Sequence, residues 1–335
     1  MSVLVSVEDV LKTFSLEEQE SAKQYFAYEK LREQHSDWGY KRLAKALGVK
    51  IARTRWWKQK KGKPCAVKTI ERLNAAGVLP FDSSDSRFEC VLRILGSLYG
   101  DGGIDALLNN IFFSSSNLDD IAVWKKDLLA VFPAASENLG VIETGEFGHG
   151  NCLRCTNRAV IRFFAALGAP IGSKVIHDNH LPQWLFSLDS DDVAWFLDGF
   201  LACEVSPPQF WYSSFRGKNY VHNFSFSLSK WEALEENHLG FLLELKKLLA
   251  RVGVKALDKT RKDVHLKRER KDFKTTYSYR VFISTGLDNV LAFNSRFKLL
   301  YAAKKKEKLE SVLERAVAFH DKLTEGKAKA LVPSA

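Results

Sequence analysis

Two carboxylates follow two similar apolar segments of the chain. Asp101 closes the segment 94–102, and Glu204 closes the segment 197–205. Both segments have the composition of a buried helix, and each carries small residues four positions apart, which are Gly96, Gly100, Gly199 and Cys203. Small residues at that spacing form a flat stripe along which two helix backbones can approach closely. The pattern therefore predicts that the two helices pack against each other through these residues.

Side-by-side packing would bring the two helix C-termini, and with them Asp101 and Glu204, to one place. Because helix C-termini carry partial negative charge, this arrangement needs a cation. Mg²⁺ prefers oxygen ligands, and roughly two or three such ions between the carboxylates could activate water and stabilise the leaving oxygen of a phosphodiester. For either segment alone, a core helix followed by an acidic turn is the simpler interpretation. Their matching positions in an internal repeat favour the paired helices.

The repeat consists of helix, strands, helix, strands and helix in the same order twice. The first copy has its elements at 91–100, 110–116, 118–132, 152–155 and 159–167. The second has them at 193–203, 223–229, 239–252, 277–283 and from about 287, with a tail helix at 304–323. We therefore expect repeats at 88–185 and 186–323, the second including the tail helix, and a frayed tail at 324–335.

The N-terminal region, 1–80, has a helical and strongly basic pattern and is followed by an expected linker at 81–87. A helix is predicted at 15–35, where Ser15 and Glu18 form a capping box and the apolar residues nearest a 3.6 period are Leu16, Tyr25, Phe26 and Leu31. Residues 39–57 resemble a helix-turn-helix with Gly48 in the turn, and Glu71 is the only acid between residues 41 and 72. Such a motif places its second helix in a DNA major groove, so we expect contacts from Lys50, Arg53, Thr54 and Lys58. One of Trp56 and Trp57 is expected in the core. The alternative is a basic helical hairpin that binds DNA or RNA without sequence preference.

Composition limits the partners of the chain. Its 335 residues carry a formal net charge of +10, which favours a polyanion or an anionic membrane surface. No apolar run is long enough to span a membrane, and the N-terminus lacks the basic start of a signal peptide. Five cysteines form no disulfide scaffold in a chain of this length. We expect a cytoplasmic, nucleoid-associated protein.

The paired segments resemble the two motifs of single-chain LAGLIDADG homing endonucleases, in the branch that includes intein-borne enzymes. The likeness covers about residues 88–315 and includes the segments 168–170, 181–185 and 293–297. It implies an α+β fold in which two αββαββα repeats form saddle-shaped antiparallel sheets over DNA, with Asp101 and Glu204 as metal ligands. Val205 and Ala202 depart from the motif without removing a ligand. Because the chain ends without the His-Asn of an intein, we expect a free-standing protein.

The resemblance also implies lysines near the scissile phosphates and basic residues on the sheets. Lys174 is the candidate in the first half, and Lys304 is the candidate in the second, with Lys305 and Lys306 as alternatives. For each of these lysines a solvated surface position is an equal alternative. DNA contacts from both halves are expected at Arg154, Arg216, Lys218, Lys259, Arg261, Lys262, Lys267, Arg268, Arg270 and Lys271.

The sequence favours a site-specific double-stranded DNA endonuclease of the intron-homing kind. Two motifs in one chain imply an internal pseudo-dimer, so a monomer with a long recognition site is expected. One alternative is a DNA-binding regulator that does not cleave, because a family of sporulation regulators joins the same scaffold to a helix-turn-helix but lacks the catalytic acids. Another is an intron maturase that binds RNA. Retention of Asp101 and Glu204 favours cleavage.

Overall fold

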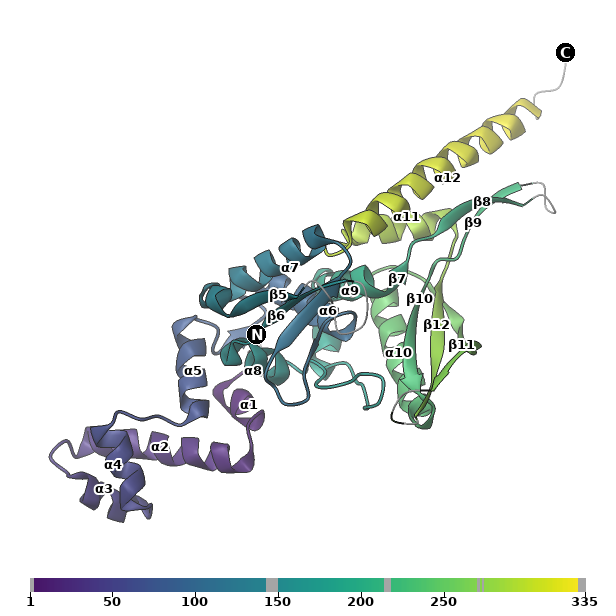
Figure 1. The fold of residues 1–335 in the computed structure, drawn as a ribbon. Coiled ribbons are helices and arrows are strands. Elements are labelled where there is room, and N and C mark those ends of the chain that lie inside the picture. The colour runs from purple at the N-terminus through teal and green to yellow at the C-terminus, as the bar shows by residue number, and fades with distance from the viewer. Residues whose placement is uncertain (1–2, 143–149, 214–217, 270–271, 273, 331–335) are drawn as a thin grey trace. The chain divides into compact units, whose positions relative to one another are not determined.

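The computed structural model describes residues 3–142, 150–213, 218–269, 272 and 274–330. Helices combine with antiparallel sheets, which confirms the expected α+β class (Figure 1). The chain divides into two compact units, Met1–Asp85 with Asn157–Leu167 and Ser86–Thr156 with Gly168–Ala335. The first unit thus takes in residues 157–167, which lie within the segment 88–185 expected to be the first repeat. Within the described ranges, no helix combines the length and the apolar character needed to cross a membrane.

The first unit is mainly helical. Its elements are β1 (Val3–Val5), α1 (Val7–Lys12), α2 (Leu16–Gln34), α3 (Tyr40–Leu47), α4 (Ile51–Gln59), α5 (Cys65–Ala75), β2 (Phe81–Asp82) and α8 (Arg158–Ala166). The capping box of α2 is present, since the Ser15 hydroxyl accepts a hydrogen bond from the Glu18 N–H at 3.3 Å. The expected apolar stripe of α2 was wrong in part, because Leu16 and Phe26 are exposed. Its buried face is formed by Ala22, Tyr25 and Tyr28, and the two tyrosine rings pack on Trp57.

Helices α3 and α4 are joined by a tight turn. Gly48 adopts a left-handed conformation with φ of 64°, and its N–H contacts the Ala44 carbonyl, which closes α3. Trp57 is buried and Trp56 is 43% exposed, so Trp57 is the core tryptophan. The region expected to be a linker begins with an ordered strand, because β2 pairs with β1 and the Phe81 ring packs edge-on against Phe163 at 5.2 Å.

The second unit contains two four-stranded sheets. Its first series is α6 (Phe88–Tyr99), β3 (Gly103–Ile104), β4 (Ile111–Ser115), α7 (Leu118–Val131), a 3₁₀ turn (Pro133–Asn138), β5 (Leu139–Ile142) and β6 (Asn151–Cys155). After a 3₁₀ turn (Gln183–Ser187), the second series is α9 (Ser190–Glu204), β7 (Val205–Ser206), β10 (Ser225–Trp231), a 3₁₀ turn (Glu232–Leu234), α10 (Glu235–Arg251), β11 (Ala256–Glu269), β12 (Thr275–Ile283), α11 (Leu287–Arg296) and α12 (Ala303–Ala330). The sheet orders β3-β4-β6-β5 and β7-β10-β12-β11 are the same when strands are matched along the chain.

The two series differ by an inserted hairpin. Strands β8 (Gln209–Ser213) and β9 (Lys218–His222) pair with each other between β7 and β10, whereas a short connection joins β3 to β4. This hairpin was not predicted from the sequence. The tail helix α12 also runs to Ala330, beyond the end at 323 expected from the sequence. Residues 331–335 lie outside the described ranges.

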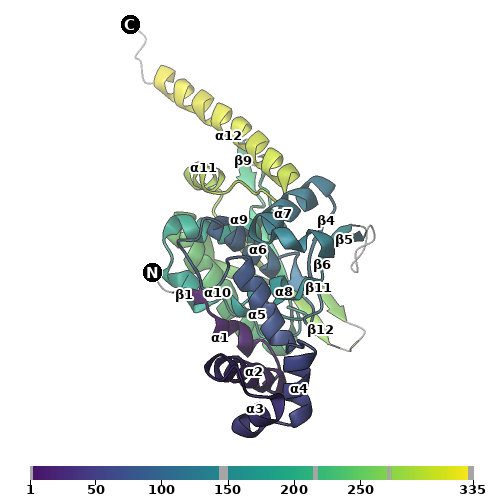
Figure 2. The same cartoon turned by 90° about the vertical axis from the view of Figure 1, so that its left-hand side faces the viewer.

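Helices α6 and α9 pack together at the centre of the second unit (Figure 2). A Cβ atom built on Gly96 would lie 1.9 Å from the carbonyl oxygen of Phe196, and one on Gly199 would lie 2.0 Å from that of Arg93. One on Gly100 would lie 2.4 Å from the Cβ atom of Cys203. Small residues are therefore required at these positions, because the backbones of α6 and α9 approach each other too closely for larger side chains. Because the contact runs along both helices, it brings their C-terminal ends together.

Candidate metal centre and nucleic-acid interface

The two carboxylates lie at the adjoining ends of these helices. Asp101 directly follows Gly100, the C-cap residue of α6, and Glu204 is the last residue of α9. Burial and the negative charge of Asp101 together raise the pKa of Glu204 to about 8, while the positive charges of Lys174 and Lys305 oppose the rise. Burial also raises the pKa of Asp101, although this residue keeps part of its surface exposed to solvent. Two acids and two lysines therefore form one electrostatic cluster.

Lys174 caps the C-terminus of α6. Its ammonium group donates to the carbonyl oxygens of Leu98 at 3.1 Å and Gly102 at 2.7 Å, and to that of Gly100. These contacts use all three donors of the group. Burial lowers the pKa of Lys174, while the negative charge of Glu204 opposes the shift. The lysine thus offsets the partial negative charge of the helix end beside Asp101.

Lys305 performs the same task at the end of α9. Its ammonium group donates to the carbonyl oxygen of Ala202 at 2.9 Å and to that of Cys203. Lys304, the candidate taken from the sequence, is exposed and lines the depression beside Asp101 without contacting a carbonyl of α9. Lys306 turns away and binds the side chain of Asn294 at 2.8 Å. Successive residues of a helix point about 100° apart, so only one of three adjacent lysines can reach this place.

A buried lysine holds the loop that carries Lys174. The Lys230 side chain is fully buried at the end of β10, and its ammonium group donates to the carbonyl oxygens of Lys174 at 2.9 Å and His177. The Asn179 side chain donates to the Lys174 carbonyl as well, at 3.1 Å. Burial lowers the pKa of Lys230 to about 8. Sequence reasoning missed this residue, although a lysine within the apolar alternation of a strand was its signal.

Buried acids hold the segment that leads to Lys305. Asp198 on α9 accepts from the N–H groups of Leu299 at 2.7 Å and Leu300 at 3.3 Å. Asp127 on α7 accepts from the Tyr301 hydroxyl at 2.6 Å. The same Asp127 carboxylate binds the Arg93 guanidinium, at 2.8 and 3.0 Å. Sequence reasoning also missed these acids.

The donor set fits magnesium bound together with a substrate. In the part of the chain that the structure describes, no three His, Cys, Asp or Glu side chains gather as a metal cage. Mg²⁺ in proteins keeps several waters and binds through one or two carboxylates plus substrate phosphates. Asp101 and Glu204 supply two carboxylates, and the depression beside Asp101 is open to solvent between β4, α7 and the start of α12. The number of ions stays a prediction.

The open face of the second sheet carries arginines. Arg261 on β11 lies opposite Arg280 on β12, and the Arg280 guanidinium donates to the Ser227 hydroxyl at 3.1 Å. The expectation for Lys262 was wrong, because its ammonium group binds Glu235 of α10 at 2.7 Å on the other face of the sheet. Side chains alternate along a strand, so neighbours cannot share a face. Arg280 was missed, although the same alternation places it beside Arg261.

The remaining sheet candidates are distributed as follows. Lys259, Lys267 and Arg268 are exposed on β11, and Arg154 is half-buried on β6 of the first sheet. The backbone of Lys218 begins β9, and its side chain is not described. Arg216, Arg270 and Lys271 lie outside the described residues.

In the first unit, α4 presents fewer of the expected residues than its sequence suggested. Thr54 was expected to touch DNA, but it is fully buried and donates to the Tyr40 carbonyl at 3.0 Å. Arg53 donates to the Gln24 side chain and Lys58 to the Trp38 carbonyl, each at 2.5 Å. Lys50 is exposed as expected. The exposed cations of α4 and its ends also include Arg55 and Lys60.

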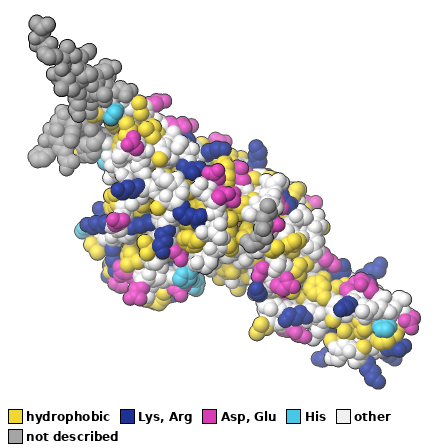
Figure 3. Space-filling model, turned by 180° about the vertical axis from the view of Figure 1, so that it is seen from behind, with side chains coloured by type: hydrophobic (Ala, Val, Ile, Leu, Met, Phe, Trp, Pro, Cys, Tyr) yellow, Lys and Arg dark blue, Asp and Glu magenta, His cyan; other side chains and the backbone are white. Residues whose placement is uncertain are grey.

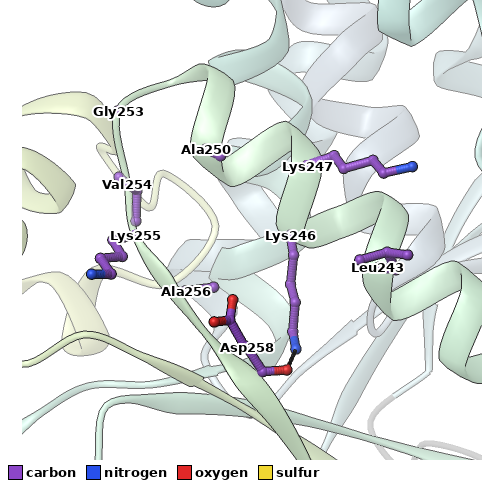
Figure 4. A pocket seen from close by; sticks show the side chains of 9 residues that line it. All are labelled: Leu243, Lys246, Lys247, Ala250, Gly253, Val254, Lys255, Ala256 and Asp258. Carbon is purple, nitrogen blue, oxygen red and sulfur yellow. Dashed lines mark hydrogen bonds between the residues drawn. The ribbon is translucent and has the colours of Figure 1, made fainter.

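Net charge alone does not mark an interface on this protein. On the face shown in Figure 3, basic and acidic side chains are interspersed. A second depression lies between α10 and β11 and is lined by Lys246, Lys247, Lys255 and Asp258 (Figure 4). There Lys246 donates to the Asp258 carbonyl at 2.7 Å, while Lys247 and Lys255 point away from each other. These lysines do not converge on a common ligand position.

Comparison with known proteins gives partial matches. No family model matches the chain. A protein named tRNA-splicing ligase RtcB from Pyrococcus abyssi is 28% identical over 245 residues, which are 70% of this chain and 25% of that protein. Its namesake from Methanocaldococcus jannaschii is 26% identical over 254 residues, 71% of this chain and 24% of that protein. The chain thus spans about a quarter of the length of these relatives.

Solved structures give a weaker likeness. A structure of variants of the homing endonuclease I-DmoI covers 63% of this chain and 90% of its own, with 13% identity and a TM-score of 0.38. A complex of I-DmoI with DNA and calcium covers 60% and 85%, with 14% identity and a TM-score of 0.36. TM-scores this low do not establish a shared fold.

Proposed function

We propose that the protein is a metal-dependent, site-specific endonuclease of the LAGLIDADG type that cleaves double-stranded DNA. The observation that carries the proposal is the pair of carboxylates, Asp101 and Glu204, at the joined ends of α6 and α9, with a lysine on each helix end. Two acids beside two negative helix ends need cations near them if both are to be ionised near neutral pH, since the pKa of Glu204 is otherwise raised to about 8. Lysines supply part of that charge, and a divalent ion with a phosphate would complete it.

In this proposal each residue of the cluster has a defined task. Asp101 and Glu204 would hold Mg²⁺, which when bound supplies an activated water and charge stabilisation at the phosphodiester. Lys174 and Lys305 fix the helix ends that carry the acids, and they keep positive charge where a phosphate would lie. Lys230, Asp198 and Asp127 position the two lysine segments through main-chain and side-chain hydrogen bonds.

The sheets and the first unit would bind the DNA around the cleavage site. Arg261, Arg280 and the exposed lysines of β11 provide contacts to phosphates or base edges. The helix pair α3–α4 of the first unit would lengthen the recognition site, and its tethering to the second unit would raise affinity. Lys50 and Arg55 are then the expected DNA contacts, in place of Thr54. A monomer suffices because both acids are in one chain.

The relatives are named as ligases of tRNA splicing, and this name favours action on RNA as a second candidate. Because the chain matches only about a quarter of their length, the matching segment need not be the part that ligates, and we propose that it is an endonuclease domain. Binding of RNA in the manner of a maturase would fit the same basic surfaces. DNA binding without cleavage is the remaining alternative, which needs neither acid.

Cleavage mapping tests these candidates together. The protein is incubated with a diverse pool of long DNA duplexes and Mg²⁺, and new ends are sequenced, beside a parallel pool of RNA. The control is the double variant Asp101→Asn, Glu204→Gln, which keeps shape and removes both charges. We expect recurrent staggered DNA ends with the wild-type protein alone. Recurrent RNA ends without DNA ends would replace the proposal by an RNA function, and bound but uncut DNA would replace it by a binding function.

A further inference from the structure

A basic groove adjoins Glu204 in the second unit. One wall is the chain that follows α9, from Val205 to Phe210, and the other is the first three turns of α12. Helix α12 contacts the β8–β9 hairpin, and the Arg315 guanidinium lies over the Phe210 ring at 4.9 Å. The two walls of the groove therefore contact each other, and Glu204 is one of the residues that line it.

Helix α12 presents several of its cations along one line of its surface. Its residues that line the groove include Lys304, Lys308, Ser311 and Arg315, which are spaced four, three and four positions apart and so share one face. The acids of the same stretch, Glu307, Glu310 and Glu314, are exposed beside this face along one of its edges and do not line the groove. In the lining of the groove, α12 therefore contributes cations and none of its acids. This charge favours an anionic partner in the groove.

The dimensions favour a polyanion that continues past the active site. At about 1.5 Å per helical residue, the cations from Lys304 to Arg315 extend over roughly 16 Å, which is about five nucleotides of a duplex at ~3.4 Å each. The series starts next to Lys305 and Glu204, where the proposed scissile phosphate would lie. The connection between β3 and β4 in the first series, in contrast, is a short turn held by the Asp105 carboxylate.

We propose that this groove binds the phosphate backbone of one DNA arm, on the Glu204 side of the cleavage site. This inference rests on the proposed function and adds an asymmetry to it, because the hairpin wall of the groove occurs in the second series of elements. Lys308 and Arg315 contact phosphates, and Ser311 lies between them. The groove contributes affinity that does not depend on base sequence.

Salt-dependent binding tests the groove without cleavage. Affinity for a linear duplex of random sequence is measured by fluorescence anisotropy in EDTA over a series of salt concentrations. Each phosphate contact contributes about 0.9 to the slope of log affinity against log salt, so Lys308→Gln with Arg315→Gln lowers the slope by roughly 2. Ser311→Arg adds a cation to the same face and raises the slope by about 0.9.

A charge-matched control and a fold control make the result decisive. The pair Lys125→Gln with Lys126→Gln removes two exposed charges from α7 and leaves the slope unchanged. Thermal unfolding of each variant shows that α12 remains packed, and Ser311→Arg tests the groove without removing the Arg315 contact. An unchanged slope in the groove pair, or an equal fall in the control pair, would overturn the inference. If the slopes change as expected in the groove variants but the wild-type protein cleaves no DNA, the proposed function alone would be overturned. Absence of duplex binding by the wild-type protein would overturn both.

Discussion

Replacing Gly96 by alanine tests whether the backbone contact between α6 and α9 sets the geometry of the acids. The new Cβ atom would lie 1.9 Å from the Phe196 carbonyl oxygen, and ordinary contact begins at 3.4 Å. The helices must therefore separate locally by roughly 1.5 Å, since both partners belong to close-packed helices. Overpacking of this kind costs about 1–3 kcal/mol, and a backbone neighbour that cannot rotate away places Gly96→Ala at the upper end.

The same displacement reaches the active site. Asp101 and Glu204 are carried by the two helix ends, so separation of α6 and α9 misplaces the acids relative to each other. A misplacement of about 1 Å can reduce catalysis ~100-fold, which is the loss we expect for cleavage by Gly96→Ala. Gly199→Ala, whose Cβ atom would lie 2.0 Å from the Arg93 carbonyl oxygen, should have the same effect.

Gly240→Ala is the matched control for both variants. Gly240 lies within α10, and a Cβ atom there would meet no atom within 4 Å. The change should stabilise α10 by about 0.5–1 kcal/mol, because alanine restricts the unfolded chain more than glycine. Amide hydrogen exchange in α6, α9 and α10 reports each helix separately, which a chain of two units requires. If Gly96→Ala protects its helix and cleaves DNA as well as Gly240→Ala does, the reasoning from helix contact is refuted.

Other substitutions test other parts of the site. Lys305→Gln should reduce cleavage by ~100-fold or more and Lys304→Gln by much less, because only Lys305 binds the end of α9; equal losses in single-turnover assays would contradict this. The folded-state pKa of Glu204 is raised to about 8 from its ordinary 4.5, so in the absence of metal its contribution to stability is complete below pH 4.5 and is lost as pH rises to about 8. Urea unfolding should show this loss of stability in the wild-type protein and a flatter dependence on pH in Glu204→Gln, and Mg²⁺ should make the loss in the wild-type protein smaller. Identical pH profiles of the two proteins would show that Glu204 has no raised pKa. Thr54→Ala should destabilise the first unit by about 1 kcal/mol without changing the DNA sequence preference, because its hydroxyl binds a buried carbonyl. Arg55→Gln should weaken DNA binding at unchanged stability. Selection of preferred sites from a random DNA pool would contradict this if Thr54→Ala changed the preferred sequence and Arg55→Gln did not weaken binding.

The acid pair could be located from the sequence because its determinants are local. Glycine spacing fixes which face of each helix can approach another backbone, and an acid directly after that helix must lie at its end. The main helices and strands of both series followed for the same reason, since helix and strand periods are properties of short segments, although the β8–β9 hairpin did not. The capping box at Ser15 and Glu18 is another local feature, and the structure contains it at the expected residues.

The features that sequence reasoning missed depend on partners far along the chain. The residues around Thr54 suggest an exposed position on a basic helix. Thr54 is nevertheless buried, because its hydroxyl donates a hydrogen bond to the Tyr40 carbonyl. Lys262 and Arg261 are neighbours in a basic run, and the register of β11 against β12 decides which of them faces α10. The choice of Lys305 among three lysines likewise depends on where α12 begins. Asp198 binds Leu299 in the loop before this helix, and Asp120 binds the N–H of Ala303, its first residue.

The two halves of the site reach the same arrangement by different means. The acids are placed by equivalent residues of α6 and α9, but the lysines arrive from unrelated segments, a loop for Lys174 and a helix start for Lys305. Each segment is held by a charged side chain that is buried within the fold, Lys230 in one case and Asp198 in the other. A buried charge is costly, so a protein selected for stability alone would replace such a residue by an apolar one. That both halves keep one where a lysine must be positioned indicates that the geometry of the four charged groups is the property these buried residues maintain.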